Sequence, residues 1–215
     1  MRPYVVRQGD YLLKLAFARG FDADEVWNDP KNADLKALRK DHRLLAPGDV
    51  VYVPEKEAEE LPIQKGTTNR YVAKVPKVTL DLRFHDGDSP FANESYEVRG
   101  LGSPLQGTTD GEGRVSVKVP VHVAEVQVVF PDRRVAFPVR VGHLDPIEEP
   151  TGVRQRLQHL GFYEAAQADA PDWADLDAVE RDRRAVTAFQ TRHGLPSSGD
   201  MDDETRAALQ KAHGA

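Results

Sequence analysis

The sequence contains no cysteine. This absence excludes disulfide bonds, thiolate metal ligands and thiol nucleophiles. Long hydrophobic runs are missing as well, because no stretch approaches the roughly 18 apolar residues that a membrane-spanning helix needs. Positive charge is not in excess either, since 29 Lys and Arg residues stand against 35 Asp and Glu residues and give a net charge of -6. We therefore do not expect nucleic acid or an anionic membrane to be a main partner.

The first ten residues, Met1 to Asp10, contain no apolar core of the kind found in secretory signal peptides. We therefore expect synthesis in the cytoplasm without a visible signal peptide. A length of 215 residues with 40% hydrophobic residues predicts two or three folded domains. The pattern of apolar and turn residues divides the chain into a domain at 1–56, a polar linker at 57–70, a domain at 71–145 and a domain at 146–215.

The first domain combines strand and helix signals. Tyr4 to Arg7 is predicted as a strand, and Asp10 is placed to cap a helix that ends at Gly20. A second helix is expected after Asp22, and the segment Val50 to Val53 is expected to form a closing strand.

The middle domain changes to a period of two, which is typical of strands with one buried face. Five segments carry this pattern between Gly, Asp and Pro turns: 78–84, 96–98, 115–119, 126–130 and 135–141. The frequent turns predict a small antiparallel β-sandwich of six or seven strands. Clustered Asp86, Asp88 and Asp110 would suit calcium, although turn formation explains the same residues more simply.

The last domain returns to helical spacing. Apolar residues predict one helix that stops at Gly161, a second that ends near Gly194 and a third that Asp202 caps. The predicted fold class is thus multidomain α+β: a strand-helix-helix-strand unit, an antiparallel β-sandwich and a C-terminal three-helix bundle.

The first domain resembles a LysM domain through the segments Tyr4–Asp10, Leu15–Ala16, Asn28 and Pro47–Pro54. LysM domains bind glycans that contain N-acetylglucosamine, such as peptidoglycan, in a groove between two loops. The resemblance places that groove here at two sets of residues: Gly9, Asp10, Tyr11 and Leu12, and Leu45, Ala46, Pro47 and Gly48. Backbone amide and carbonyl groups there would match the acetamido groups of the sugar.

Two features of this domain depart from the family. Tyr11 stands where family members usually have Thr, and residues 31–43 lengthen the segment after Asn28. Either change would block or reshape the groove. The alternative is a LysM-like unit that docks on protein, and an exposed flat patch around Tyr11 and Trp27 would favour it.

The last domain resembles the three-helix peptidoglycan-binding domain that accompanies many cell-wall hydrolases. The matching segments are 153–163, 185–190, 193–196, Gly199, Asp202 and 205–209. Most of these positions pack or cap helices, so the match indicates the fold more directly than the ligand. The segment Ala165 to Asp177 is longer and more acidic than the loop between the family's first two helices.

The order of the three units is similar to proteins encoded beside type VI secretion and other phage-tail-like injection systems. The resemblance implies a peptidoglycan-binding adaptor that positions a partner at the bacterial cell wall, delivered to the periplasm or a target cell by an injection system. The alternative is a structural or cargo-adaptor component of a contractile injection system.

Catalytic motifs are lacking. The seven histidines are isolated along the chain, with no His-Glu-x-x-His pairing, and there is no Gly-x-Ser-x-Gly or Ser-x-x-Lys motif. A pair of carboxylates for glycoside hydrolysis stays open as a third hypothesis. We therefore expect no enzyme activity, no catalytic residues, no cofactor and no metal.

Overall fold

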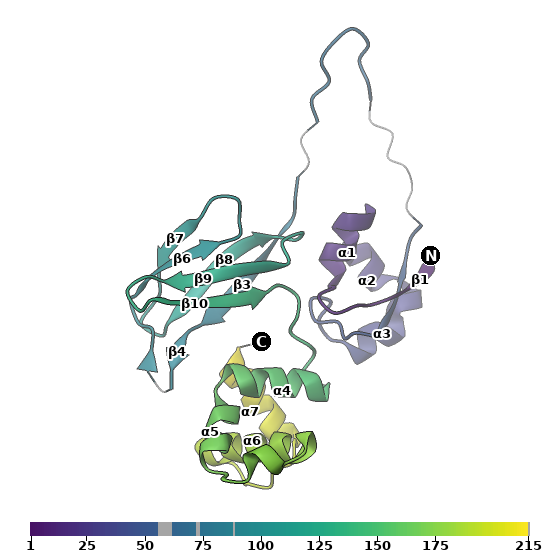
Figure 1. Ribbon diagram of the computed structural model, residues 1–215. Helices are drawn as coiled ribbons and strands as arrows, with labels where there is room; N and C mark the ends of the chain where they lie inside the picture. Colours follow the sequence, from purple (N-terminus) through teal and green to yellow (C-terminus); the bar gives the residue numbers. More distant parts are fainter. Residues whose placement is uncertain (56–61, 72–73, 88, 215) are drawn as a thin grey trace. The chain divides into compact units, whose positions relative to one another are not determined.

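The computed structural model describes residues 1–55, 62–71, 74–87 and 89–214. The chain divides into two compact units, Met1–His143 and Leu144–Ala215. The first unit contains helices and antiparallel strands and the second contains helices (Figure 1), so the chain is α+β as the sequence predicted. Of the predicted linker, residues 57–61 lie outside the described residues, and residues 62–70 contain neither helix nor strand.

The N-terminal part of the first unit is a two-stranded sheet combined with short helices. Its elements are β1 (Arg2–Val5), α1 (Leu12–Arg19), α2 (Ala23–Asn28), η1 (Pro30–Asn32), α3 (Ala33–Leu38) and β2 (Val50–Val53). β1 and β2 pair antiparallel, with Arg2 opposite Val53. The helices pack on this sheet through the buried side chains of Leu12, Leu15, Val26 and Trp27.

The helix ends follow local chemistry. Gly20 adopts a left-handed conformation (φ 73°) and closes α1, and the Asp22 carboxylate accepts hydrogen bonds from Asp24 N and Glu25 N at the start of α2. The prediction that Asp10 caps α1 was wrong. Tyr11 is the capping position, and the Asp10 carboxylate instead accepts hydrogen bonds from Arg7 N and Tyr4 Oη.

Buried polar groups fix the long connection between α2 and β2. The Asn32 side chain is fully buried, donates to Val26 O (2.8 Å) and Tyr52 O (2.9 Å), and accepts from Tyr52 N (2.7 Å). Arg39 and Asp49 form a bidentate ion pair (2.9 and 3.0 Å) with both side chains almost fully buried. The Asn32 amide and the Arg39–Asp49 pair thus have partners that offset their desolvation.

Antiparallel strands form the rest of the first unit. They are β3 (Lys77–Arg83), β4 (His85–Asp86), β5 (Ser89–Pro90), β6 (Ser95–Arg99), β7 (Leu105–Thr108), β8 (Arg114–Pro120), β9 (Glu125–Phe130) and β10 (Val135–Arg140). One sheet has the order β10-β9-β6-β7, β3 pairs with β8, and β4 pairs with β5. Val98 and Val128 of the first sheet share one hydrophobic core with Val115 and Val117 of the β3-β8 pair.

The alternating pattern located five of these strands to within two residues but missed β4, β5 and β7. β7 was missed because its residues, Leu105 to Thr108, do not alternate between apolar and polar. Asp110 accepts hydrogen bonds from Glu112 N and Arg114 N, which is the turn role weighed against calcium binding. Asp88 lies outside the described residues.

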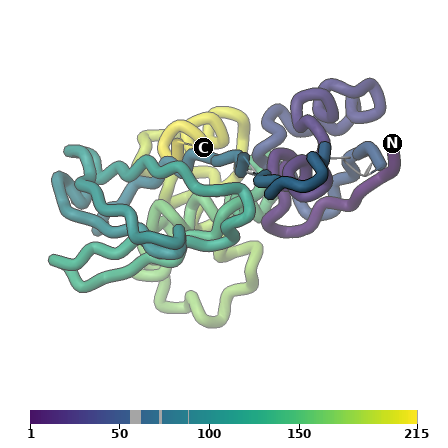
Figure 2. Tube along the Cα trace, turned by 90° about the horizontal axis from the view of Figure 1, so that it is seen from above, coloured from purple at the N-terminus to yellow at the C-terminus, as the bar shows by residue number. Residues whose placement is uncertain are grey.

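The second unit is a compact group of helices around one core (Figures 1 and 2). Its elements are α4 (Pro150–His159), α5 (Phe162–Ala168), η2 (Trp173–Asp175), α6 (Ala178–Arg192) and α7 (Asp203–His213). Gly161 and Gly194 are left-handed two residues after the last residues of α4 and α6, and Asp202 caps α7 through Thr205 N, all as expected. The prediction of three helices omitted α5, which lies partly in the segment expected to be an acidic loop.

Candidate functional site

The first predicted glycan loop is largely inaccessible. Gly9, Tyr11 and Leu12 are buried and Asp10 is half-buried. The backbone N–H of Asp10 donates to Arg7 O (2.9 Å), and that of Leu12 donates to His42 O (3.2 Å). Two of the amides expected to meet acetamido groups are therefore already engaged within the protein.

Loops that follow strands β8 and β10 bury this loop. The Tyr11 side chain is 3% exposed, and its hydroxyl donates to Val121 O (3.2 Å). Gly142 lies against the Tyr11 ring, so closely that a Cβ atom there would be 2.7 Å from it, and Gln8 donates to His143 O (3.1 Å). Burial raises the pKa of Tyr11 to about 12. Tyr11 thus joins the core shared by the two sheets.

The second predicted loop is half accessible. Leu45 and Ala46 are buried, whereas Pro47 and Gly48 are exposed. Ala46 N donates to the Asp49 carboxylate (2.8 Å), and Gly48 N donates to Val6 O (2.9 Å). Five of the eight predicted residues are thus buried, and the proposed glycan groove stays a prediction.

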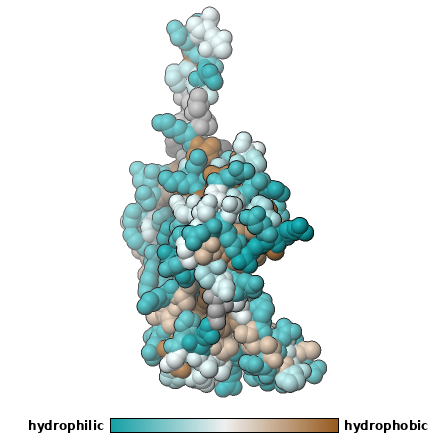
Figure 3. All heavy atoms as spheres, turned by 90° about the vertical axis from the view of Figure 1, so that its left-hand side faces the viewer, coloured by the Kyte–Doolittle hydropathy of each residue, from teal (hydrophilic) through white to brown (hydrophobic). Residues whose placement is uncertain are grey.

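Trp27 was the other residue named for an exposed docking patch. Its side chain is 6% exposed, and its ring contacts the His42 ring edge-on at 5.8 Å. Because Tyr11 and Trp27 are both buried, they do not form an exposed apolar patch. The surface that faces the viewer in Figure 3 is mainly hydrophilic, and its hydrophobic residues form small separate areas.

Polar side chains organise the helical unit. The Gln190 side chain, 0% exposed, accepts from Gly199 N (2.9 Å) and donates to Asp200 O (2.9 Å) and Thr205 Oγ1 (3.1 Å). It thereby fixes the loop between α6 and α7 to both helices. The fully buried Arg156 donates to Asp145 O (2.8 Å) and Gly152 O (2.9 Å), and burial lowers its pKa to about 10.

A second cluster of polar side chains joins α4, α5 and α6. Arg154 forms a bidentate ion pair with Asp182 (2.9 and 2.5 Å), and the Tyr163 hydroxyl donates to the same carboxylate. The Asp182 hydrogen bond keeps the pKa of Arg154 above its usual value, and burial raises that of Tyr163. These contacts hold the Tyr163 ring in one orientation.

The connection between α5 and α6 carries a second aromatic ring. Trp173 begins the short turn η2, is half-buried, and meets the Tyr163 ring edge-on (6.0 Å, 89°). Arg181 of α6 donates to Trp173 O (3.2 Å) and Ala174 O (3.1 Å). Trp173 was not among the residues selected from the sequence, although its position in Pro-Asp-Trp-Ala-Asp, where turn residues flank an aromatic ring, was a usable signal.

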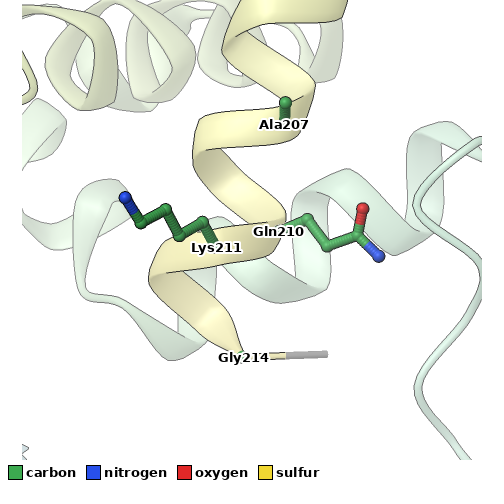
Figure 4. A pocket seen from close by; sticks show the side chains of 4 residues that line it. All are labelled: Ala207, Gln210, Lys211 and Gly214. Carbon is green, nitrogen blue, oxygen red and sulfur yellow. The ribbon is translucent and has the colours of Figure 1, made fainter.

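Two open hollows lie on the described surface. One of about 430 Å³ is lined by Ala207, Gln210, Lys211 and Gly214, with Gln210 and Lys211 pointing to different sides of α7 (Figure 4). It has no aromatic ring, and all four lining residues come from α7 and its end. Another of about 440 Å³ lies at β6 and β7 beside Tyr96.

Two histidines meet at the end of α7. His159 Nδ1 lies 3.0 Å from His213 Nε2, and burial lowers the pKa of His213 to about 4.

Within the described ranges, no three histidine or acidic side chains are grouped to hold a metal ion. No helix in those ranges is long and apolar enough to cross a membrane.

The fold of residues 148–209 has a counterpart among known families. This segment matches the family described as Putative peptidoglycan binding domain. The match covers the described helices from α4 to Leu209 of α7, including the turn with Trp173. It confirms the resemblance of the C-terminal domain and supports a peptidoglycan-binding role. No curated protein matches the chain, and no solved structure does.

Proposed function

We propose that the protein is a non-catalytic adaptor that binds peptidoglycan and positions a partner at the bacterial cell wall. The observation that carries this proposal is the match of residues 148–209 to the peptidoglycan-binding family. The match is supported by a core that belongs to this unit alone, built on Leu157, Phe189 and Leu209. The helical domain is thus the wall-binding module of the proposal.

In this proposal the N-terminal part is a LysM-like unit and the strand-rich part is a β-sandwich that serves as a spacer or docking platform. The pairing of β1 with β2 around short helices supports the first assignment, and the core shared by two sheets supports the second. A second, weaker glycan site at Pro47 and Gly48 would add avidity if both ends of the chain engaged the wall at once.

Absence of catalysis is part of the proposal, supported by the missing catalytic motifs of the sequence. Its test is a turbidity assay on purified cell walls over several hours. We expect no loss of turbidity beyond a buffer control. A loss of turbidity that depends on protein concentration would establish a hydrolase instead, with a carboxylate pair as the first candidate.

Binding itself is tested by co-sedimentation of the full chain with purified, protein-free peptidoglycan at physiological salt. We expect saturable retention in the pellet, competed by soluble wall fragments. Retention should not fall as salt is raised, because the chain is acidic and the wall also carries carboxylates, so salt screens a repulsion and local grooves must supply the affinity. Absence of retention would refute the proposal.

The second candidate is a structural or cargo-adaptor component of a type VI or other contractile injection system, in which the LysM-like unit docks on protein. One observation weakens glycan binding by this unit and so leaves room for the second candidate: the first predicted glycan loop is buried within the chain, where Tyr11 contacts Val121. The exposed patch at Tyr11 and Trp27 that docking would use is not present. Both candidate functions include delivery of the protein to the periplasm or a target cell by such a system. Co-purification with tail-tube or sheath proteins, without wall binding, would support this second candidate over the first.

A further inference from the structure

The turn that carries Trp173 is held rigidly from α6. Arg184 makes a bidentate ion pair with Asp172 (2.8 and 3.1 Å), and Arg181, almost one helical turn before it, donates to the carbonyl groups of Trp173 and Ala174. Three successive residues are therefore fixed by two arginines. A ring fixed in this way loses little conformational freedom when a ligand binds to it.

The ring itself does not serve the core of the helical unit. Trp173 belongs neither to the buried cluster around Leu157 and Phe189 nor to the half-buried side chains that pack on that cluster. It contacts the Tyr163 ring edge-on, the Arg181 guanidinium lies over it at 6.0 Å from the ring centroid, and its neighbours Asp172, Ala174 and Asp175 are exposed. A large aromatic ring outside the core, on a turn fixed by an ion pair and two hydrogen bonds to its carbonyl groups, points to contact with a ligand.

The chemistry around the ring fits a sugar. One face of a pyranose ring presents C–H groups that stack on an aromatic ring, while its rim presents hydroxyl groups that donate hydrogen bonds. Here the apolar surface is the indole of Trp173, and the exposed Asp175 carboxylate offers an acceptor on the same turn.

We propose that the Trp173 turn is the glycan-contacting surface of the helical unit, with the indole ring stacking on a sugar ring of peptidoglycan. This assignment rests on the proposed wall-binding function and adds to it the site and the sugar moiety of the ligand. Tyr163 is a positioning residue, because it fixes the indole through its edge-on contact and is itself held by Asp182.

The test is co-sedimentation of full-length variants with purified peptidoglycan. Trp173→Ala should weaken binding about tenfold or more, because truncating an aromatic anchor removes the main contact. Trp173→Phe should retain most of the affinity, because it keeps an aromatic face. Val179→Ala is the matched control: Val179 is 76% exposed in the first turn of α6, and its truncation should leave binding unchanged.

A measurement on the unmodified chain complements the variants. The chain has two tryptophans, and Trp27 is buried in the other unit. Soluble wall fragments containing N-acetylglucosamine and N-acetylmuramic acid should therefore shield Trp173 from acrylamide quenching. Unchanged quenching at saturating fragment would overturn the assignment even if Trp173→Ala failed to fold.

The outcomes separate the two proposals. Failure of the wild-type chain to bind peptidoglycan refutes both the proposed function and this site. Wild-type binding together with equal binding by a folded Trp173→Ala variant refutes the site alone and leaves the function in place. Binding that is lost in Trp173→Ala, kept in Trp173→Phe and kept in Val179→Ala supports the site.

Discussion

At the scale of single residues, Tyr11 has the largest consequence for function. The LysM resemblance placed it in a glycan groove, where family members usually have Thr. The structure instead buries its ring in the core of the strands, with the hydroxyl donating to Val121 O. The first predicted glycan loop is therefore joined to the strand-rich part of the same unit.

Two substitutions at Tyr11 should destabilise the first unit by different amounts. Tyr11→Phe loses one buried hydrogen bond and should cost about 1 kcal/mol. Tyr11→Ala also leaves a cavity and should cost about 3 to 5 kcal/mol. Differential scanning calorimetry of the full chain measures both through the transition of the first unit.

Val5→Ala provides the control for this series. Val5 is 57% exposed in β1, so its truncation should change the free energy of unfolding by no more than about 0.5 kcal/mol. If Tyr11→Ala changed stability as little as Val5→Ala, the contact between Tyr11 and the strands would not exist in solution.

At the scale of elements, the entry into α4 shows how a loop and a helix constrain each other. Gly152 lies in the first turn of α4, and a Cβ atom there would be 1.9 Å from Pro146 O and 2.7 Å from Asp145 O. Both obstacles are backbone atoms. The segment before α4 can therefore pack on the helix only because residue 152 has no side chain.

Gly152→Ala should therefore destabilise the second unit, although Ala is the better helix former. The helix preference of Ala contributes about 1 kcal/mol of stabilisation, whereas forcing the backbone apart costs about 1 to 3 kcal/mol or more. We expect steric overlap to dominate and the thermal transition of this unit to fall by several degrees.

The matched control for this substitution is Gly111→Ala. A Cβ atom at Gly111 would meet nothing within 4 Å, so the same change of residue type should leave stability nearly unaltered. Equal melting of the Gly152→Ala variant and the wild type would contradict the packing of residues 145–146 on α4.

At the scale of the whole molecule, the chain forms two compact units with separate cores. Val98, Phe130 and Leu12 lie in the cores of the first unit, and Leu157 and Phe189 in that of the second. The three predicted domains therefore occupy two compact units, because the N-terminal part and the strands belong to one.

Separate expression of 1–143 and 144–215 should give two proteins that each unfold cooperatively. Their transitions, measured by calorimetry, should together reproduce that of the full chain. A fragment that begins at residue 71 is the control. It lacks the N-terminal part and exposes the surface of the strands that Tyr11 covers in the full chain. The strand-rich part of this 71–215 fragment should therefore melt at a lower temperature. An unfolded 144–215 fragment would contradict the division.

Much of the fold follows from local sequence patterns. The period of two located five strands, and Gly20, Asp22, Gly161 and Asp202 marked helix ends, because these signals depend on backbone preferences of single residues. β7 was missed because its segment lacks apolar alternation, and α5 because the family resemblance placed a loop over its second half. They are stabilised by pairing with β6 and by packing on α6, which are tertiary contacts.

The sequence by itself determined that the chain has no thiol chemistry, that it is α+β, and that its last third resembles a peptidoglycan-binding domain. Composition and spacing carry the first two properties directly, and the matching segments carry the resemblance. Only the tertiary structure decided which side chains are accessible: it buries Tyr11 and Trp27 and leaves Trp173 outside the core on a turn fixed by two arginines. Accessibility depends on which surfaces pack together, and residues distant in the chain supply those surfaces.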